Sequence, residues 1–356
     1  MHLRQDRMSN LERIEALFSY KRLDRVPIGS LNPGFQVKNF GVPIATAYED
    51  PQKNFEAMLW VLEQYGWDSL THLNGHTTLG TLDFGGIMRL PKGEFEGSLV
   101  EESFPVENES DVKRLKVPDP KRAGFLQLAV EFAKLQAEHG MPVTMYFRSP
   151  FGMAGNICGL EQFLKWLYKK PELCYRLMDL SIAHMCNVLD NWLETFGAEK
   201  LLVWMSSPSE SNQVISPKHF EEFALPYHHR FHEKLEKTGV SRFGLHICGD
   251  QNLNLPLFSA HSPWQHPSIL SFGHEVDLAT AGQIFPEDII FGNINPVVFQ
   301  TKRPEEIYAL CKIAIEKGKR ARGGFVLGPG CGLPPFSIPA NVYAMTKAVN
   351  DYGWYE

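Results

Sequence analysis

One histidine and two cysteines have the residue types and the spacing of a metal site. His246 and Cys248 stand two positions apart in an apolar run that ends at Gly249, so in a β-strand both side chains point to the same side. Cys331 follows the last apolar run of the chain, in a Gly-Pro-Gly-Cys-Gly turn. One imidazole and two thiolates suit zinc, and three protein ligands with an exchangeable fourth position are typical of a catalytic site.

The alternative for these residues is structural. A core histidine with satisfied nitrogens and two cysteines that serve as small apolar residues would give the same His-x-Cys pattern. The glycine-rich turn around the second cysteine favours the metal site, because the carboxyl ends of barrel strands meet at one face. His72 and His76 also have a metal-like spacing, but they fall in a predicted loop.

The elements that would position these residues are eight short apolar runs, separated by segments with helical spacing. The runs cover residues 25–29, 67–70, 142–148, 201–206, 243–248, 269–272, 289–294 and 325–328. One helix is predicted to begin after Ser216 and to end before Gly239, and another to cover residues 304–318. Strands that alternate with helices over this length predict an α/β fold, a (β/α)8 TIM barrel, with a doubly wound open sheet as the competitor.

Residues 80–120 interrupt this alternation. Apolar runs at 82–90 and 98–106 flank a Pro-Lys-Gly turn, which predicts a β-hairpin within an insertion. The residues before the first predicted strand form an N-terminal extension. Because no repeat or low-complexity tract divides the chain, we expect a single domain over residues 1–356.

The charge and the hydrophobicity of the chain restrict the classes of partner that we expect it to bind. The chain has 35 Lys+Arg against 41 Asp+Glu, a formal charge of -6, and no basic run interleaved with aromatic residues that would indicate a nucleic-acid ligand. No run reaches the roughly 20 apolar residues that span a bilayer, and the polar N-terminus lacks the apolar centre of a signal peptide. We therefore expect a cytoplasmic protein that binds neither nucleic acid nor membranes, with reduced cysteines.

Several segments together resemble the uroporphyrinogen decarboxylase (URO-D) superfamily, in the same order along the chain. These segments are residues 10–13, 24–27, 149–154, 215–217, 223–227, 246–249, 292–296 and 339–342. The resemblance covers nearly the whole chain. It implies a URO-D-like (β/α)8 barrel whose site lies at the carboxyl ends of the strands.

The sequence departs from the true decarboxylases of that superfamily at two places. Those enzymes have an arginine-rich segment that binds substrate carboxylates and a Gly-His-Gly turn near the C-terminus. Here residues 28–34 contain no arginine, and Cys331 stands where the histidine would be. A porphyrinogen with many carboxylates needs cationic partners, so a uroporphyrinogen-type decarboxylase becomes the minor alternative.

The His-x-Cys and Pro-Gly-Cys-Gly motifs resemble the zinc-dependent methyltransferases of the superfamily, which include methylcobalamin:coenzyme M methyltransferases and bacterial O-demethylase systems. The resemblance implies zinc bound by His246, Cys248 and Cys331. It also implies a corrinoid supplied by a partner protein, because the chain has no Asp-x-His-x-x-Gly cobalamin motif. The small substrate is then a methoxylated aromatic or other methyl ether as donor, or a thiol such as coenzyme M as acceptor. A zinc-stabilised, non-catalytic binding protein is the third hypothesis.

Four further residues are candidates for contacts with the substrate or the metal. Glu210, after the fourth predicted strand, is the candidate acid for the fourth metal position, and a solvated loop carboxylate is its alternative. Arg148 is a candidate to bind a sulfonate or carboxylate of the substrate, and a structural salt bridge is its alternative. Asn293 and Asn295 would orient the substrate or cap the turn after the seventh strand.

Overall fold

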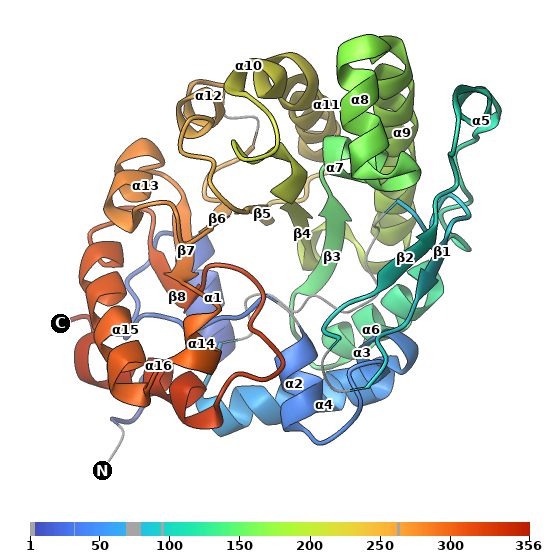
Figure 1. Ribbon diagram of the computed structural model, residues 1–356. Coiled ribbons are helices and arrows are strands. Elements are labelled where there is room, and N and C mark those ends of the chain that lie inside the picture. Colours follow the sequence, from blue (N-terminus) through green and yellow to red (C-terminus); the bar gives the residue numbers. More distant parts are fainter. Residues whose placement is uncertain (1–3, 32, 69–79, 94–95, 262–263) are drawn as a thin grey trace.

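The computed structural model describes residues 4–356 except 32, 69–79, 94–95 and 262–263, and its centre is a parallel sheet that curves into a barrel (Figure 1). Six strands pair in parallel in the order β3-β4-β5-β6-β7-β8. They are β3 Val143–Arg148, β4 Leu201–Ser206, β5 Phe243–Ile247, β6 Ile269–Phe272, β7 Ile289–Ile294 and β8 Phe325–Pro329. Each agrees with a predicted run to within one residue at either end, so these strand predictions are confirmed.

The other two predicted strands, at 25–29 and 67–70, do not form regular strands in the described residues. Ile28 makes a single parallel bridge with Leu327 of β8, and the Gly29 amide donates to the Leu327 carbonyl at 3.0 Å. On the other side, the Ile28 amide donates to the Asp68 carboxylate at 2.9 Å instead of to a backbone carbonyl. A side chain thus replaces part of the strand ladder. The first segment therefore lies beside β8, and the Asp68 amide donates to the Ile28 carbonyl at 2.8 Å, which places residue 68 beside the first segment. Residues 69 and 70 lie outside the described residues.

The interior of the barrel is filled by large side chains that alternate along the strands. Trp204, Phe291 and Val326 pack there with residues of helix α1 (Asn10–Phe18), notably Leu17. Leu17 also lies close to Gly324, which precedes β8, so α1 covers the end of the barrel where the strands begin. The predicted N-terminal extension therefore closes one end of the barrel and leaves the other for the site.

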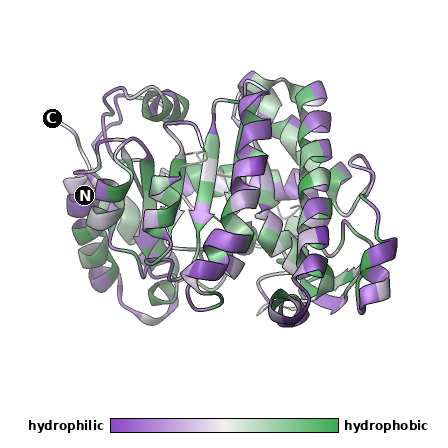
Figure 2. Ribbon diagram, turned by 90° about the horizontal axis from the view of Figure 1, so that it is seen from above, coloured by the Kyte–Doolittle hydropathy of each residue, from purple (hydrophilic) through white to green (hydrophobic). Residues whose placement is uncertain are grey.

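Helices surround the barrel, and the larger hydrophobic core lies between them and the outer face of the strands (Figure 1). Hydrophobic and hydrophilic residues alternate along these helices, as amphipathic helices require (Figure 2). They include α4 Pro51–Tyr65, α6 Leu126–Glu138, α7 Pro150–Cys158, α8 Leu160–Lys169, α9 Pro171–Phe196, α12 Leu255–Ala260, α13 Leu278–Ile284, α15 Pro304–Gly318 and α16 Pro339–Tyr352; shorter ones are α2 Pro33–Asn39, α3 Thr46–Glu49 and α14 Val298–Thr301. No helix among the described residues is long and apolar enough to cross a membrane.

The helix predicted after Ser216 is present, but its middle is irregular. Ser216 caps α10 (Pro217–His219), a π-helical turn covers Phe220–Ala224, and α11 continues from Leu225 to Glu236. Pro226 has no amide hydrogen for the regular helical bond, and the Leu225 amide bonds to the Phe220 carbonyl five residues back. The second predicted helix, 304–318, is confirmed as α15.

The predicted insertion contains the expected hairpin. Strands β1 (Ile87–Arg89) and β2 (Val100–Ser103) pair antiparallel, and both are shorter than predicted. The short helix α5 (Glu109–Arg114) follows them, and the whole insertion lies at the periphery of the barrel (Figure 1). The insertion therefore lies outside the barrel and does not change the order of the barrel strands.

Candidate metal centre

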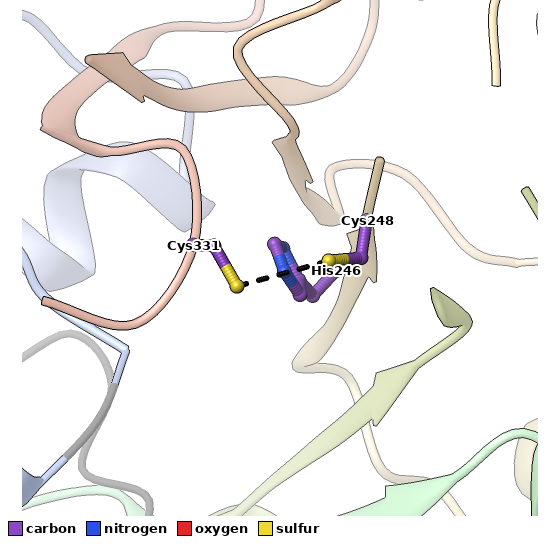
Figure 3. A group of neighbouring side chains, drawn as sticks. All are labelled: His246, Cys248 and Cys331. Atoms are coloured by element: carbon purple, nitrogen blue, oxygen red, sulfur yellow. Dashed lines mark hydrogen bonds between the residues drawn. The ribbon is translucent and has the colours of Figure 1, made fainter. Parts of the chain in front are cut away.

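The structure brings the three predicted metal ligands together from two strands that are far apart in sequence. His246 lies in β5, Cys248 directly follows it, and Cys331 follows β8 (Figure 3). One ligand atom from each residue lies within 4.8 Å of the other two, and the two Sγ atoms are 3.7 Å apart. In the described part of the chain, this is the one group of three or more histidines, cysteines or carboxylates with such geometry.

Two glycines allow the loops that carry and surround these residues to approach one another. A Cβ on Gly330, beside Cys331, would lie 2.8 Å from the backbone nitrogen of His274. A Cβ on Gly273 would lie 2.8 Å from the backbone nitrogen of Gly249. Because real Cβ atoms essentially never come within 3.0 Å of another heavy atom, the loops after β5, β6 and β8 meet only with glycine at these positions.

The His246 ring is oriented by one hydrogen bond and is open at its other nitrogen. Nδ1 is hydrogen-bonded to Ser271 Oγ at 3.0 Å, whereas the buried Nε2 has no partner among the described residues. When Nδ1 donates to Ser271, Nε2 presents a lone pair. This arrangement differs from the alternative of a core histidine with both nitrogens satisfied. An unpaired buried nitrogen beside two thiols fits a soft divalent cation such as zinc.

The two thiols titrate as a pair. The hydrogen bond from Cys248 lowers the pKa of Cys331, and His246 lowers it further. The same hydrogen bond and burial raise the pKa of Cys248. Two neighbouring thiolates repel each other, so both cysteines become anionic together only when a cation binds between them.

Glu210 is buried rather than solvated, so the alternative of a solvated loop carboxylate is wrong. It ends the short 3-10 helix Pro208–Glu210 after β4, with no exposed surface. Its Oε2 is 2.9 Å from Nε2 of the equally buried His228, while Oε1 has no hydrogen bond among the described residues. The structure does not bring Glu210 into the group of His246, Cys248 and Cys331.

Another acid, not identified from the sequence, affects the charge of one of the two thiols. Glu275, in the loop after β6, is among the charged groups that raise the pKa of Cys248. Its side chain is 27% exposed and lies 3.4 Å from His274 Nδ1. The signal in the sequence is an acid just after a predicted strand end, which many loops share, so pattern alone does not distinguish it.

Arg148 ends β3 in the same row as the metal group. Arg148 pairs in register with Ser206, Ser206 with His246, and His246 with Ser271, so the four side chains share the inner face of the barrel. The predicted alternative of a structural salt bridge is not found: Arg148 makes no ion pair within the described residues, and its Nε is buried without a hydrogen bond.

The two asparagines at the end of β7, Asn293 inside the strand and Asn295 directly after it, have backbone partners. Asn293 Nδ2 donates to the carbonyls of Gly273 and Val276 at 2.9 and 2.6 Å, which fixes the loop after β6. Asn295 Oδ1 accepts from the Val297 amide at 3.0 Å in the next turn. The Asn295 contact matches the capping alternative, whereas Asn293 binds the loop after β6 and does not cap the turn after β7. Substrate binding by either asparagine stays a prediction. His72 and His76 lie outside the described residues.

A buried amide pair, missed by the sequence reasoning, supports the Cys248 loop. Gln251 Nε2 donates to the carbonyls of Ser207 and Cys248 at 2.8 and 3.3 Å, and Asn254 Nδ2 donates to the Glu210 carbonyl at 2.9 Å. Gln251 and Asn254 have no exposed surface. Each amide therefore ties the loop after β5 to the loop after β4.

Comparisons with known proteins show which sequences and folds this chain is similar to. The family model for uroporphyrinogen decarboxylase (URO-D) matches residues 9–352. The methylcobamide:CoM methyltransferase MtbA of Methanosarcina acetivorans is 24% identical over 254 residues, 69% of this chain and 70% of that protein. The methylcobamide:CoM methyltransferase MtaA of Methanosarcina barkeri is 23% identical over 346 residues, 96% of this chain and 97% of that protein. A solved methyltransferase from Methanosarcina mazei has the same fold, with a TM-score of 0.80 at 20% identity over 97% of this chain and 99% of that one.

Proposed function

This chain belongs to the uroporphyrinogen decarboxylase family, and from that premise we propose that it is a zinc-dependent methyltransferase. It moves a methyl group between a small substrate and the cobalt of a corrinoid that a partner protein carries. The observation that carries the proposal is the convergence of His246, Cys248 and Cys331 within 4.8 Å, with the buried Nε2 of His246 unpaired. The similarity to two methylcobamide:CoM methyltransferases supports the corrinoid and the thiol substrate.

The ligand set favours one type of chemistry. Zinc bound here would act as a Lewis acid that lowers the pKa of a substrate thiol or polarises the oxygen of a methyl ether. The two thiolates of Cys248 and Cys331 donate charge and reduce that acidity, which favours a substrate thiolate as methyl acceptor over ether cleavage. Ser271 holds the His246 ring in place, and Gln251 holds the backbone of Cys248. Demethylation of a methoxylated aromatic is the competing direction.

The arginines of the N-terminal region argue against a uroporphyrinogen-type decarboxylase, because both already have partners within the protein. Arg13 pairs with Asp24 at 2.7 Å, and Arg25 pairs with Asp68 at 2.9 Å. Both guanidinium groups are buried and engaged in stabilising the fold, so neither is free for the carboxylates of a porphyrinogen. A zinc-stabilised binding protein is also less well supported, because the barrel has an extensive hydrophobic core of its own.

The test is the metal content and methyl transfer of the wild type and of the Cys248→Ser and Cys331→Ser variants. We expect about one zinc per chain in the wild type. Both variants should lose most of the zinc together with at least ~10-fold of the methyl transfer to or from cobalamin. Cys186→Ser, in α9 and outside the metal group, is the matched control and should retain both.

Three outcomes would count against the proposal. A folded wild type that binds no zinc would remove the metal site. Decarboxylation of a porphyrinogen by the wild type would favour the decarboxylase. Unfolding on zinc removal, with no methyl transfer from any donor, would favour the zinc-stabilised binding protein.

A further inference from the structure

Two of the six cysteines of the chain meet at the metal group, and their thiols contact each other. The Sγ atoms of Cys248 and Cys331 are 3.7 Å apart and hydrogen-bonded (Figure 3). Both residues are half-buried, so small solutes can reach their sulfur atoms. None of the other four cysteines is hydrogen-bonded to a second thiol within the described residues. The metal group therefore contains an accessible pair of neighbouring thiols.

The second pair of neighbouring cysteines has a different environment. Cys158 and Cys174 interact electrostatically, but both are buried. The Cys158 thiol donates to the Ala154 carbonyl at 3.6 Å, and the Cys174 thiol donates to the Phe163 carbonyl at 3.5 Å. Burial raises the pKa of Cys158, and it raises the pKa of Cys174 to about 12. Because the thiolate is the reactive form of cysteine, these two residues should resist oxidation.

A disulfide between the two thiols of the metal group requires a small local movement. The bond is about 2.05 Å long, so the two Sγ atoms must approach each other by about 1.7 Å. Cys331 lies between Gly330 and Gly332, and Gly249, which has a φ of +75°, follows Cys248. Glycine adopts backbone conformations that other residues rarely adopt. The two loops can therefore adjust more readily than a strand would.

We propose that Cys248 and Cys331 form a reversible disulfide that releases the zinc when a peroxide reaches the site. This inference rests on the proposed function and concerns the regulation of the same site. One sulfur attacks a peroxide oxygen and becomes a sulfenic acid, and the second sulfur then displaces the hydroxyl group of that acid. The two sulfurs give two electrons to the peroxide. The peroxide takes up two protons, from the thiols or from solvent when zinc is bound, and becomes two molecules of water.

The disulfide changes the metal affinity because zinc binds thiolates. A sulfur in a disulfide carries no negative charge, so of the three ligands the oxidised site keeps His246 alone. The barrel has an extensive hydrophobic core of its own, and the oxidised protein should remain folded without the ion. A dithiol reductant restores both thiols by exchange. Oxidation thus turns the site off, and reduction turns it on again.

The experiment treats the full-length protein, first zinc-free and then zinc-loaded, with one equivalent of hydrogen peroxide. We expect a thiol titration under denaturing conditions to lose two of the six cysteines, and the intact mass to fall by two hydrogen atoms. A peptide map should join Cys248 to Cys331. The zinc-loaded protein should release its ion to a chromophoric chelator, with an affinity lowered by at least ~100-fold. Dithiothreitol should restore both the thiols and the affinity.

Two variants test which sulfurs react. Cys331→Ser should form no disulfide and should instead gain oxygen atoms at Cys248. Cys186→Ser removes another half-buried thiol, in α9, and should form the disulfide as the wild type does. Retention of all six thiols by the wild type, or gain of oxygen without a sulfur–sulfur link, would overturn the proposed switch.

Methyl transfer by the reduced, zinc-loaded protein is measured in parallel, because it separates this inference from the proposed function. A protein that transfers methyl groups but forms no disulfide would contradict the switch and leave the methyltransferase intact. A protein that forms the disulfide and releases zinc, but transfers no methyl group when reduced, would contradict the methyltransferase and leave the switch intact.

Discussion

The two ring nitrogens of His246 have different roles, since one orients the ring and the other is open to a metal. Residues that contact the ring therefore affect how it can bind the metal. Nδ1 is committed to Ser271, and Nε2 faces the thiols with no partner in the described structure. Because this hydrogen bond already fixes the ring, less conformational entropy is lost when a metal binds. The same holds for Cys248, whose carbonyl is bonded to the buried Gln251. The identities of the ligands were predicted from the sequence, whereas these supporting residues were found only in the structure.

At the residue scale, we predict that Glu275 and not Glu210 is the acid that acts on the metal. Glu275 lies within electrostatic reach of Cys248, and Glu210 is paired with His228. Glu275→Gln should weaken zinc binding by about 10-fold, because a nearby carboxylate attracts the cation. Glu210→Gln should leave zinc affinity nearly unchanged and lower the stability of the fold, because it weakens a buried pair.

Competition with a chromophoric zinc chelator measures the two affinities, and urea denaturation measures the two stabilities. The variants are isosteric, so each serves as the control for the other. Loss of zinc in Glu210→Gln with normal affinity in Glu275→Gln would restore Glu210 as the acid at the fourth metal position.

Among the elements, the barrel strands were the easiest to predict. Strands of a parallel sheet are covered on both faces and therefore appear as continuous apolar runs. β4 is such a run, with all six residues buried. The helix after Ser216 was harder, because a proline in its interior shifts the hydrogen bonds at Phe220–Ala224 into a π-helical turn. Periodicity predicts that a helix exists there, but not how its backbone accommodates Pro226.

A buried histidine in helix α11, His232, should lower the stability of the folded protein in mild acid. His232 is buried in it, and burial, followed by the neighbouring His228 and His229, holds its pKa well below 6.5. The unfolded chain takes up this proton near pH 6.5 and the folded chain does not. The free energy of unfolding is therefore highest above that pH and falls below it, by about 1.4 kcal/mol per pH unit for one proton.

Urea denaturation between about pH 5 and about pH 7.5, where histidines titrate, measures this dependence. His232→Phe should keep the ring contact with Phe243 and show a shallower loss of stability in acid. His139→Gln, on an exposed helix end, is the control and should behave as the wild type. Equal slopes for the wild type and His232→Phe would contradict the assignment to α11.

At the scale of the whole molecule, one buried carboxylate connects the elements at which the barrel closes. Asp68 accepts the Ile28 amide and pairs with both Arg13 and Arg25, so it connects α1, the first strand position and the second. Its side chain has no exposed surface. Backbone bonds join residues 27–29 to Leu327 of β8, and the Asp68 carboxylate replaces a backbone acceptor only for the Ile28 amide, between the first and second strand positions.

We predict that Asp68→Asn lowers the free energy of unfolding by about 3 kcal/mol or more, because two buried guanidinium groups lose a shared anion. Guanidinium chloride or thermal denaturation measures the change. Glu161→Gln breaks the exposed pair with Lys165 and should leave the midpoint at the wild-type value. A wild-type midpoint for Asp68→Asn would show that closure does not depend on this charge.

The sequence alone determined the ligand types, six of the strands, the helix at 304–318 and the hairpin, because each depends on local spacing and on burial that leaves an apolar pattern. The family resemblance drawn from its motifs is confirmed by the match over residues 9–352. That the whole chain forms one domain stays a prediction.

Only the tertiary structure decided which polar groups meet across the barrel. His228 is hydrogen-bonded to Glu210, Glu275 raises the pKa of Cys248, and Arg148 has no carboxylate partner in the described chain. These side chains come from different strands and loops, and loop conformation sets their distances. The hydrophobic periodicity of the sequence does not predict the conformation of these loops. Metal ligands were predictable because their chemistry restricts the residue types, whereas carboxylates and arginines serve on any surface until the fold places them.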